Sequence, residues 1–322
     1  MQPRSMSRLP ALNTDQVDLL RVLSVLGTIV VIAAIASSGV FLQPANIVNV
    51  LQQNAILFVL AVAQFLVILT GGIDLSSGAV VALASVLFVS FLDYGVAVAA
   101  LVALASGILV GILNGVLVTM LRLPSFVVSL GTTLIIYSLA KVFTGGGTVQ
   151  GSMGGATIPA AVSSFYAQTL AGFPAPLVAF ATVLGLVALY LRLLPGHLLY
   201  AIGGNARAAR LAGAPVRAVR IAGYAISSSL AAFGGILFAA RVGYGDPQAG
   251  VWLPLDAIAA VAIGGASLTG GRGTLAATVT GVLIIAVLNN AMNLVGAPPT
   301  LQPTIKGVII ILAVFVYMRR LD

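Results

Sequence analysis

The chain has 322 residues, of which 60% are hydrophobic and 7% are charged, and its formal net charge is +8. Because a soluble domain carries about 25% charged residues, this composition excludes an ordinary soluble domain. The absence of cysteine excludes a disulfide framework and a thiolate metal site, and the single histidine, His197, is expected to be structural, so no catalytic residue and no metal are predicted.

Ten apolar segments predict an all-α, polytopic membrane protein with about ten transmembrane helices. Each crossing needs roughly 20 residues, because a helix rises 1.5 Å per residue and the hydrocarbon layer is about 30 Å thick. Two segments, Ser76–Leu92 and Leu255–Leu268, are short and edged by glycines, so they either cross fully or form half-helices or re-entrant elements. The ten segments are Leu19–Val40, Asn46–Leu69, Ser76–Leu92, Val96–Met120, Ser125–Phe143, Pro174–Leu193, Ala218–Ala240, Leu255–Leu268, Thr274–Met292 and Pro303–Met318.

The N-terminal region has two interpretations. Residues 1–18 are predicted to form a cytoplasmic tail, followed by a transmembrane domain over residues 19–322. Basic residues followed by Val22–Ile35 and the small residues of Ala34–Ala36 also resemble a cleaved secretory signal. The remaining segments insert in either case.

The distribution of basic residues predicts the orientation. With ten crossings both termini share one side, and that side then holds twelve of the 15 Lys and Arg residues. Only Lys141, Arg241 and Lys306 fall on the opposite side. The positive-inside rule therefore predicts that both termini are cytoplasmic. Because the basic residues lie between apolar segments, no nucleic-acid partner is predicted.

An internal repeat is expected between residues 46–143 and 218–318, joined by the 194–217 loop. Gly111–Gly115 aligns with Ala286–Asn290 at an offset of 175, and Asp74 aligns with Asp256 at an offset of 182. The identities are few, and chance similarity in a chain rich in alanine and glycine is the alternative. Under the predicted topology the repeat is inverted, which is how many transporters build two gates around one site.

The segment after the second span combines helix-breaking and helix-capping residues. A double glycine ends the span, and Asp74 can cap the next helix. The segment is either a tight inner turn or a gate that contacts a partner. The candidate gate residues here are Gly71, Gly72, Asp74 and Ser76.

A short capped helix is predicted in the basic loop. Asn205 is a candidate N-cap, Gly213 suits the left-handed position after the helix, and Pro215 blocks its continuation. Such a helix either docks on another protein and transmits motion or lies on lipid headgroups through its arginines. The candidate docking residues are Asn205, Ala206, Arg207, Ala208, Ala209, Arg210, Leu211 and Gly213.

A second glycine-rich turn follows the eighth span. Two glycine pairs suggest a phosphate-binding loop, but the lysine of such a loop is missing, so the chain is not expected to bind nucleotide or any cofactor itself. We group this turn with the candidate gate: Gly264, Gly265, Gly270, Gly271 and Arg272.

Uncharged polar residues within the spans are candidates for a translocation path. Amides and hydroxyls can bond sugar hydroxyls, or they can join helices to one another. The aspartates fall at span ends or in loops, which argues against a proton-driven carrier. The candidate path residues are Asn54, Gln64, Asn114, Thr132, Asn289 and Asn290.

These motifs together resemble the ribose-type branch of the ABC permease family that also includes branched-chain amino-acid permeases. The resemblance extends from about Asn46 to Arg320, and its most specific pieces are Thr70–Gly78, Leu123–Thr132, Ala201–Gly213 and Leu255–Val261.

The resemblance implies a multi-pass permease subunit of the bacterial inner membrane that imports a sugar by alternating access. The implied partners are cytoplasmic ABC ATPase subunits that bind the ATP, a periplasmic sugar-binding protein, and a second permease copy as homodimer or paralogous heterodimer within the bilayer. Asn205–Gly213 would be the coupling helix on the ATPase, although Ala206 stands where relatives often have an acidic residue.

Three alternatives stay open at this point. The same importer can carry another small polar solute, such as a polyol, nucleoside, autoinducer or branched-chain amino acid. The chain can also be a stand-alone secondary carrier, or a channel without energy coupling.

Overall fold

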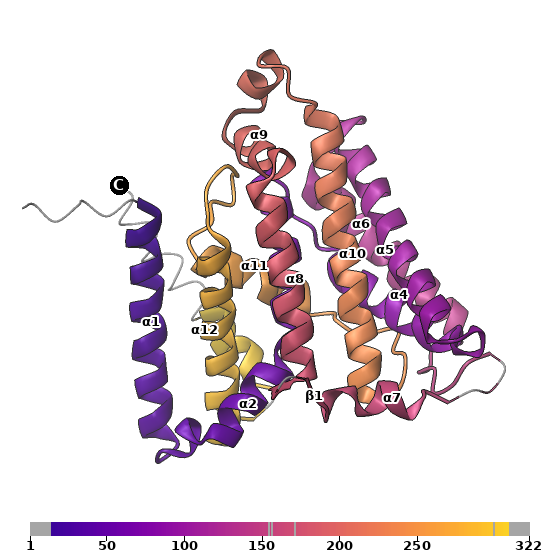
Figure 1. Cartoon of the computed structure of the whole chain (residues 1–322), viewed down its shortest axis with the longest axis vertical. Helices are drawn as coiled ribbons and strands as arrows, with labels where there is room; N and C mark the ends of the chain where they lie inside the picture. The colour runs from indigo at the N-terminus through magenta and orange to yellow at the C-terminus, as the bar shows by residue number, and fades with distance from the viewer. Residues whose placement is uncertain (1–13, 154, 156, 171, 299, 309–322) are drawn as a thin grey trace, which may run out of the picture.

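The computed structural model describes residues 14–153, 155, 157–170, 172–298 and 300–308 as a bundle of helices (Figure 1). Two short strands in one connection pair antiparallel, with Thr169 opposite Pro174 and Leu170 opposite Phe173. The elements are α1 (Thr14–Ala36), η1 (Val40–Leu42), α2 (Pro44–Gln53), α3 (Ala55–Leu69), α4 (Ser77–Ser90), η2 (Leu92–Tyr94), α5 (Val96–Thr119), α6 (Ser125–Thr144), α7 (Ala160–Ser163), η3 (Ser164–Tyr166), β1 (Thr169–Leu170), β2 (Phe173–Pro174), α8 (Ala175–Arg192), α9 (Leu194–Leu211), α10 (Val216–Val242), α11 (Leu253–Ile263) and α12 (Leu275–Leu294).

Several helices are long and apolar enough to cross a membrane. Among the described residues there are 6 such helices, or 7 if α2 and α3, which meet at a bend of 48°, form one broken span. The predicted ten helices are therefore not confirmed. Most of the tenth predicted segment, and residues 1–13 of the predicted tail, lie outside the described residues. Helix α1 begins at Thr14, within the region predicted as tail.

Helix α3 forms the centre of the bundle. Every residue from Ala55 to Leu69 is buried, and α10, α11, α12 and α8 pack around it. A helix that is apolar on all sides suits either lipid or a protein interior, and here neighbouring helices enclose it. In contrast, α5 and α6 expose large apolar side chains such as Leu109, Leu134 and Ile135, as expected for helices that face lipid.

Helices α4 and α11 are half-length elements, with 14 and 11 residues. At 1.5 Å per residue each spans only about 15–20 Å, less than the hydrocarbon layer. Their N-termini meet inside the bundle, where a Cβ on Gly78 would clash with the Gly250 carbonyl and with the Pro254 ring. The non-helical segments 70–76 and 243–252 lead into them. The structure thus agrees with the half-helix interpretation of both short segments.

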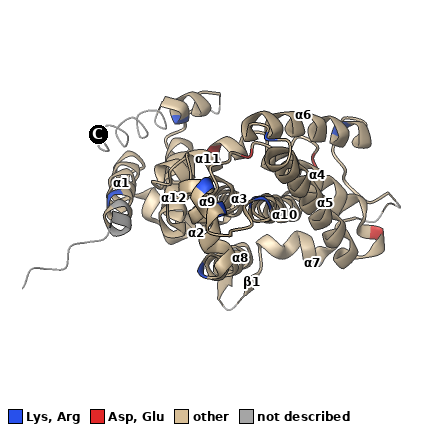
Figure 2. Cartoon of the chain, turned by 90° about the horizontal axis from the view of Figure 1, so that it is seen from above, with Lys and Arg blue, Asp and Glu red and all other residues tan. Residues whose placement is uncertain are grey.

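The bundle has two distinct ends (Figure 1). We call the end with α9 the α9 end and the end with α2, α7 and β1 the α7 end. Seen from above the α9 end, basic residues lie over α9 and α10, and few acidic residues are visible (Figure 2). The α6–α8 connection lies along the α7 end and pairs Val149 with Gly245 through two backbone hydrogen bonds of 2.8 Å.

Candidate functional site

A buried polar network surrounds Asp74, in the break between α3 and α4. The Asp74 Oδ1 atom accepts hydrogen bonds from the Ser76 backbone N–H at 2.8 Å and from the Ser76 hydroxyl at 2.6 Å. The Gln64 side chain of α3, in the amide orientation that satisfies both groups, donates to the Asp74 carbonyl at 2.9 Å and accepts from its N–H at 3.1 Å. Asp74 therefore organises the turn before α4. The prediction that it caps this helix is wrong, because Ser76 occupies the N-cap position and, among the described residues, no side chain accepts from the first N–H groups of α4.

The network continues into α5 and α6. Asn114 donates from Nδ2 to the Ser76 hydroxyl at 2.9 Å, and its Oδ1 accepts from the Thr132 hydroxyl at 2.7 Å. All five side chains of the network are buried: Gln64, Asp74, Ser76, Asn114 and Thr132. Three candidate path residues and two candidate gate residues thus form one structural unit, although the sequence predicted them as two separate groups.

The other candidate path residues lie elsewhere. Asn290 of α12 and Asn46 of α2 exchange two hydrogen bonds of 3.0 Å. Asn54 donates to the Val50 carbonyl at the α2–α3 bend, at 2.8 Å. The buried Oδ1 atom of Asn289 has no hydrogen-bond partner among the described residues. Two of these three amides therefore serve to join or shape helices in this conformation.

The two glycine-rich turns meet at the α9 end. The Gly271 N–H donates to the Leu69 carbonyl at 3.0 Å, and a Cβ on Gly71 would lie 2.9 Å from the Thr269 carbonyl oxygen. Gly203 of α9 packs between them, because a Cβ there would overlap the Leu69 carbonyl and the Gly271 nitrogen. Three segments far apart in the sequence therefore touch backbone to backbone.

The remaining residues of the second turn shape its return to α12. Gly264 packs against the Ala277 backbone, and Gly265 and Gly270 have φ angles of 82° and 95°, which favour glycine. The Arg272 carbonyl accepts from the Ser267 N–H at 3.0 Å. The turn is thus closed on itself as well as held against α3.

The predicted short helix in the basic loop is confirmed. Asn205 interrupts α9 with extended backbone angles of −158° and 94°, and its Oδ1 accepts from the backbone N–H groups of Arg207 at 3.1 Å and Ala208 at 2.9 Å. This is N-cap geometry. Gly213 has a φ of 86°, as a left-handed C-terminal residue should.

The short helix has a buried side and an exposed side. Ala209 is buried, and Ala206 is packed against the core. Arg207, Arg210 and Leu211 are exposed. The segment is therefore attached to the bundle by Ala206 and Ala209 and presents its longer side chains outward.

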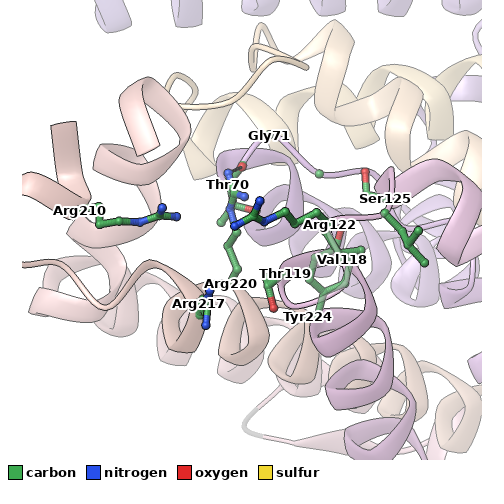
Figure 3. Close-up of a pocket in the computed structure, with 12 residues that line it drawn as sticks. Thr70, Gly71, Val118, Thr119, Arg122, Ser125, Arg210, Arg217, Arg220 and Tyr224 are labelled. Carbon is green, nitrogen blue, oxygen red and sulfur yellow. Dashed lines mark hydrogen bonds between the residues drawn. The ribbon is translucent and has the colours of Figure 1, made fainter. Parts of the chain in front are cut away.

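A basic pocket, which no sequence motif predicts, opens at the α9 end. Its volume is about 380 Å³ (Figure 3). Its walls combine the α3–α4 break, the end of α5, the start of α6, the short helix of α9, and α10. The lining residues are Thr70, Gly71, Gly72, Val118, Thr119, Arg122, Leu123, Ser125, Arg210, Arg217, Arg220 and Tyr224. Of its four arginines only Arg210 was a candidate site residue, and no pattern in the sequence brings Arg122 next to Arg210.

The comparison with known families decides the membership of the chain. The family described as the permease component of branched-chain amino acid transport systems matches residues 46–314. The chain belongs to this permease family. Residues from Gln64 to Arg272, which include the network, the glycine turns and the short helix, all fall within the matched region.

Curated relatives of this permease are similar over most of their length. The ribose import permease of Escherichia coli (strain K12) is 37% identical over 304 residues, covering 91% of this chain and 92% of that protein. The ribose import permease of Bacillus subtilis (strain 168) is 37% identical, with 82% of each chain covered. The D-allose transport system permease of Escherichia coli (strain K12) is 32% identical, with 84% and 82% covered. No solved structure matches the permease.

Proposed function

We propose that this permease is the membrane subunit of a binding-protein-dependent ABC importer that carries a monosaccharide across the bacterial inner membrane. The relatives named above import ribose or allose, which supports a sugar as the transported solute. The observation that carries the mechanism is the capped helix Asn205–Gly213, seated on both glycine turns through Gly203.

The capped helix is proposed to dock on a partner ATPase. Its N-cap and its left-handed Gly213 make it a rigid, compact element, and its exposed Arg207 and Leu211 offer a charged and an apolar contact. Gly203, two residues before the capped helix, contacts the Leu69 and Gly271 backbones with no side chain between them. Movement of the capped helix reaches the glycine turns through this contact. Close-packed contacts of this kind transmit displacement instead of absorbing it.

Alternating access is proposed to use the two half-helices. Helix α4 starts near Gly78 and runs to the α7 end, where the Ser90 carbonyl accepts from Met153. Helix α11 starts beside it and leads to the turn that contacts Leu69. This opposite arrangement supports an inverted repeat, and each half-helix with its extended lead completes one crossing in the proposed ten-crossing topology. Broken helices that meet near the midplane form substrate sites in many transporters.

The proposed orientation places the α9 end in the cytoplasm. Arg122 and Arg210 line the pocket at that end, and Arg207 lies in the short helix of α9. Lys141 and Arg241 lie in the last turns of α6 and α10, away from the pocket at which both helices begin. The positive-inside rule supports this orientation and puts both termini in the cytoplasm. The α7 end, with the connection from Thr144 to Phe173, then receives the sugar-binding protein. A second permease copy would complete the importer within the bilayer.

A secondary carrier is the second candidate, and one observation favours it. Asp74 lies outside the helices, as predicted, yet it is fully buried, and its Oδ2 atom has no hydrogen-bond partner among the described residues. A buried carboxylate is a typical proton relay in proton-driven carriers. The sequence argument against such a carrier is weakened to this extent.

Reconstitution separates the two candidates. The permease, its ATPase and its binding protein are placed in liposomes, and uptake of radiolabelled ribose is measured with internal ATP and without a proton gradient. We expect uptake that needs both partners and that stops when a non-hydrolysable ATP analogue replaces ATP. Uptake by the permease alone that collapses when the proton gradient is removed would establish the secondary carrier instead.

A further inference from the structure

The basic pocket carries four unbalanced positive charges. Arg122, Arg210, Arg217 and Arg220 line it, and no aspartate or glutamate does. Within the described part of the chain, none of these four guanidinium groups forms an ion pair with a carboxylate. Like charges held close together repel one another, and a bound anion relieves that repulsion.

Three of the four guanidinium groups point toward one space, although Arg122, Arg210 and Arg217 remain exposed to solvent. Arg122 and Arg220 both extend to Thr70, and Arg210 points from α9 toward the same space (Figure 3). Arg220 donates to the Thr70 carbonyl at 3.4 Å, and its buried Nε has no partner among the described residues. Its fork of donors is therefore only partly used by the protein.

Arg122 has an unfavourable backbone conformation. Its φ of 57° lies in the left-handed region, which residues other than glycine rarely adopt. Glycine would be the natural residue at this turn between α5 and α6. Strained backbone of this kind is concentrated at functional positions, where the side chain is needed.

The start of α6 adds a further positive field. Ser125 is the first residue of this 20-residue helix and lines the pocket. The first N–H groups of a helix lack partners within it, and the helix dipole favours negative charge at this end. Arginine forks and helix N-termini are both donors suited to the several oxygens of a phosphate.

We propose that this pocket binds a phosphate group, supplied by the headgroup of an anionic phospholipid. The volume of about 380 Å³ is far larger than a bare phosphate ion requires and accommodates a phosphoglycerol headgroup. The pocket lies at the ends of α3, α5 and α10, where headgroups meet a membrane protein, and basic pockets between transmembrane helices are typical sites for such lipids. The site goes beyond the proposed transport function and does not depend on the solute carried.

The functional consequence follows from the residues involved. Arg210 belongs to the capped helix, Thr70 and Gly71 belong to the glycine turn, and Arg122 precedes α6. One phosphate group bound among them would hold the capped helix against the turn that it is proposed to move. An anionic lipid would therefore stabilise the coupling region.

The test uses the purified full-length permease without its partners. Lipid retention is measured by native mass spectrometry, with phosphatidylglycerol and phosphatidylcholine in competition, and the midpoint of thermal unfolding is measured in parallel. We expect the wild type to retain phosphatidylglycerol and to unfold at a higher temperature with it. The variants Arg122→Gln and Arg220→Gln should each bind it about fivefold more weakly. Arg192→Gln is the matched control, because this exposed arginine at the same end does not line the pocket and should bind as the wild type does.

The outcomes identify the occupant. Inorganic phosphate alone could raise the unfolding midpoint as much as phosphatidylglycerol does, with the effect lost in Arg122→Gln. That result would retain the phosphate site and assign it to free phosphate. Equal loss of retention in Arg192→Gln, or no preference over phosphatidylcholine, would overturn the proposal. If Arg220→Gln lowers the unfolding midpoint even without lipid, the retention of phosphatidylglycerol by Arg122→Gln and Arg217→Gln decides whether the pocket binds it. Transport is not measured in this test, so its failure leaves the proposed function standing.

Discussion

Asn114 uses both ends of its amide inside the bundle. It donates to Ser76 and accepts from Thr132, so it joins α5 to the α3–α4 break and to α6. Each of these bonds gives a partner to buried polar groups that would otherwise be unsatisfied, and an unsatisfied buried polar group is costly. The net effect is to hold the non-helical segment before α4 in a single conformation.

Replacing this amide is therefore expected to destabilise the fold. Asn114→Ala leaves the Thr132 hydroxyl without its acceptor and should lower the free energy of unfolding by about 2 kcal/mol, the order of a buried hydrogen-bonded group. Denaturant unfolding in detergent micelles, followed by intrinsic fluorescence, measures the change. Asn289→Ala is the matched control, because the Asn289 Oδ1 atom has no partner among the described residues. A loss in Asn289→Ala as large as that in Asn114→Ala would contradict the assigned role.

The contact between elements at the α9 end depends on two adjacent glycines that differ sharply. A Cβ on Gly203 would overlap the Leu69 carbonyl and the Gly271 nitrogen, whereas a Cβ on Gly204 would meet nothing within 4 Å. Both residues lie in the helical part of α9 before Asn205. Alanine has the higher helix propensity at both positions, so any harm must come from the tertiary contact.

Gly203→Ala is expected to separate α9 from the two glycine turns. Overpacking of this size costs about 1–3 kcal/mol, and ATP-driven uptake should fall by about tenfold because the capped helix no longer moves the turns. Gly204→Ala should retain wild-type uptake and a wild-type or slightly higher unfolding midpoint. Both are measured in the reconstituted importer described above. Normal uptake by a folded Gly203→Ala protein would show that coupling does not pass through this contact.

At the scale of the whole molecule, the charge asymmetry between the two ends predicts the orientation in the membrane. The chain has no cysteine, so single-cysteine variants need no altered background. Arg207 is exposed at the α9 end, and Gly147 is exposed in the connection at the α7 end. The two positions therefore report on opposite sides.

A membrane-impermeant maleimide should label Gly147→Cys in intact spheroplasts and Arg207→Cys only in inverted vesicles. The physical reason is the preference of arginine-rich loops for the cytoplasmic side. Labelling in detergent provides the control for reactivity at each site. The reverse pattern of accessibility would invert the topology and remove the ATPase from the capped helix.

The amino-acid sequence by itself determined the class of protein and where the short capped helix begins and ends. The shortage of charge and the long apolar segments require a membrane protein, and the order Asn205, Gly213, Pro215 requires a short capped helix, because capping depends only on neighbouring residues. The family could be predicted for the same reason, since its motifs are contiguous. The half-length of α4 and α11 was visible as short segments edged by glycine.

Tertiary structure alone decided which distant residues meet. Gln64, Asp74 and Asn114 share one buried network, and Arg122 faces Arg210 across a pocket, because helix packing sets these distances and the periodicity of a helix records only which face is apolar. Burial of Asp74 was likewise invisible, since a loop residue is expected at the surface. A composition rich in alanine, valine and leucine fits lipid and protein interior equally well, so the sequence could count apolar segments but could not say that α3 lies at the centre.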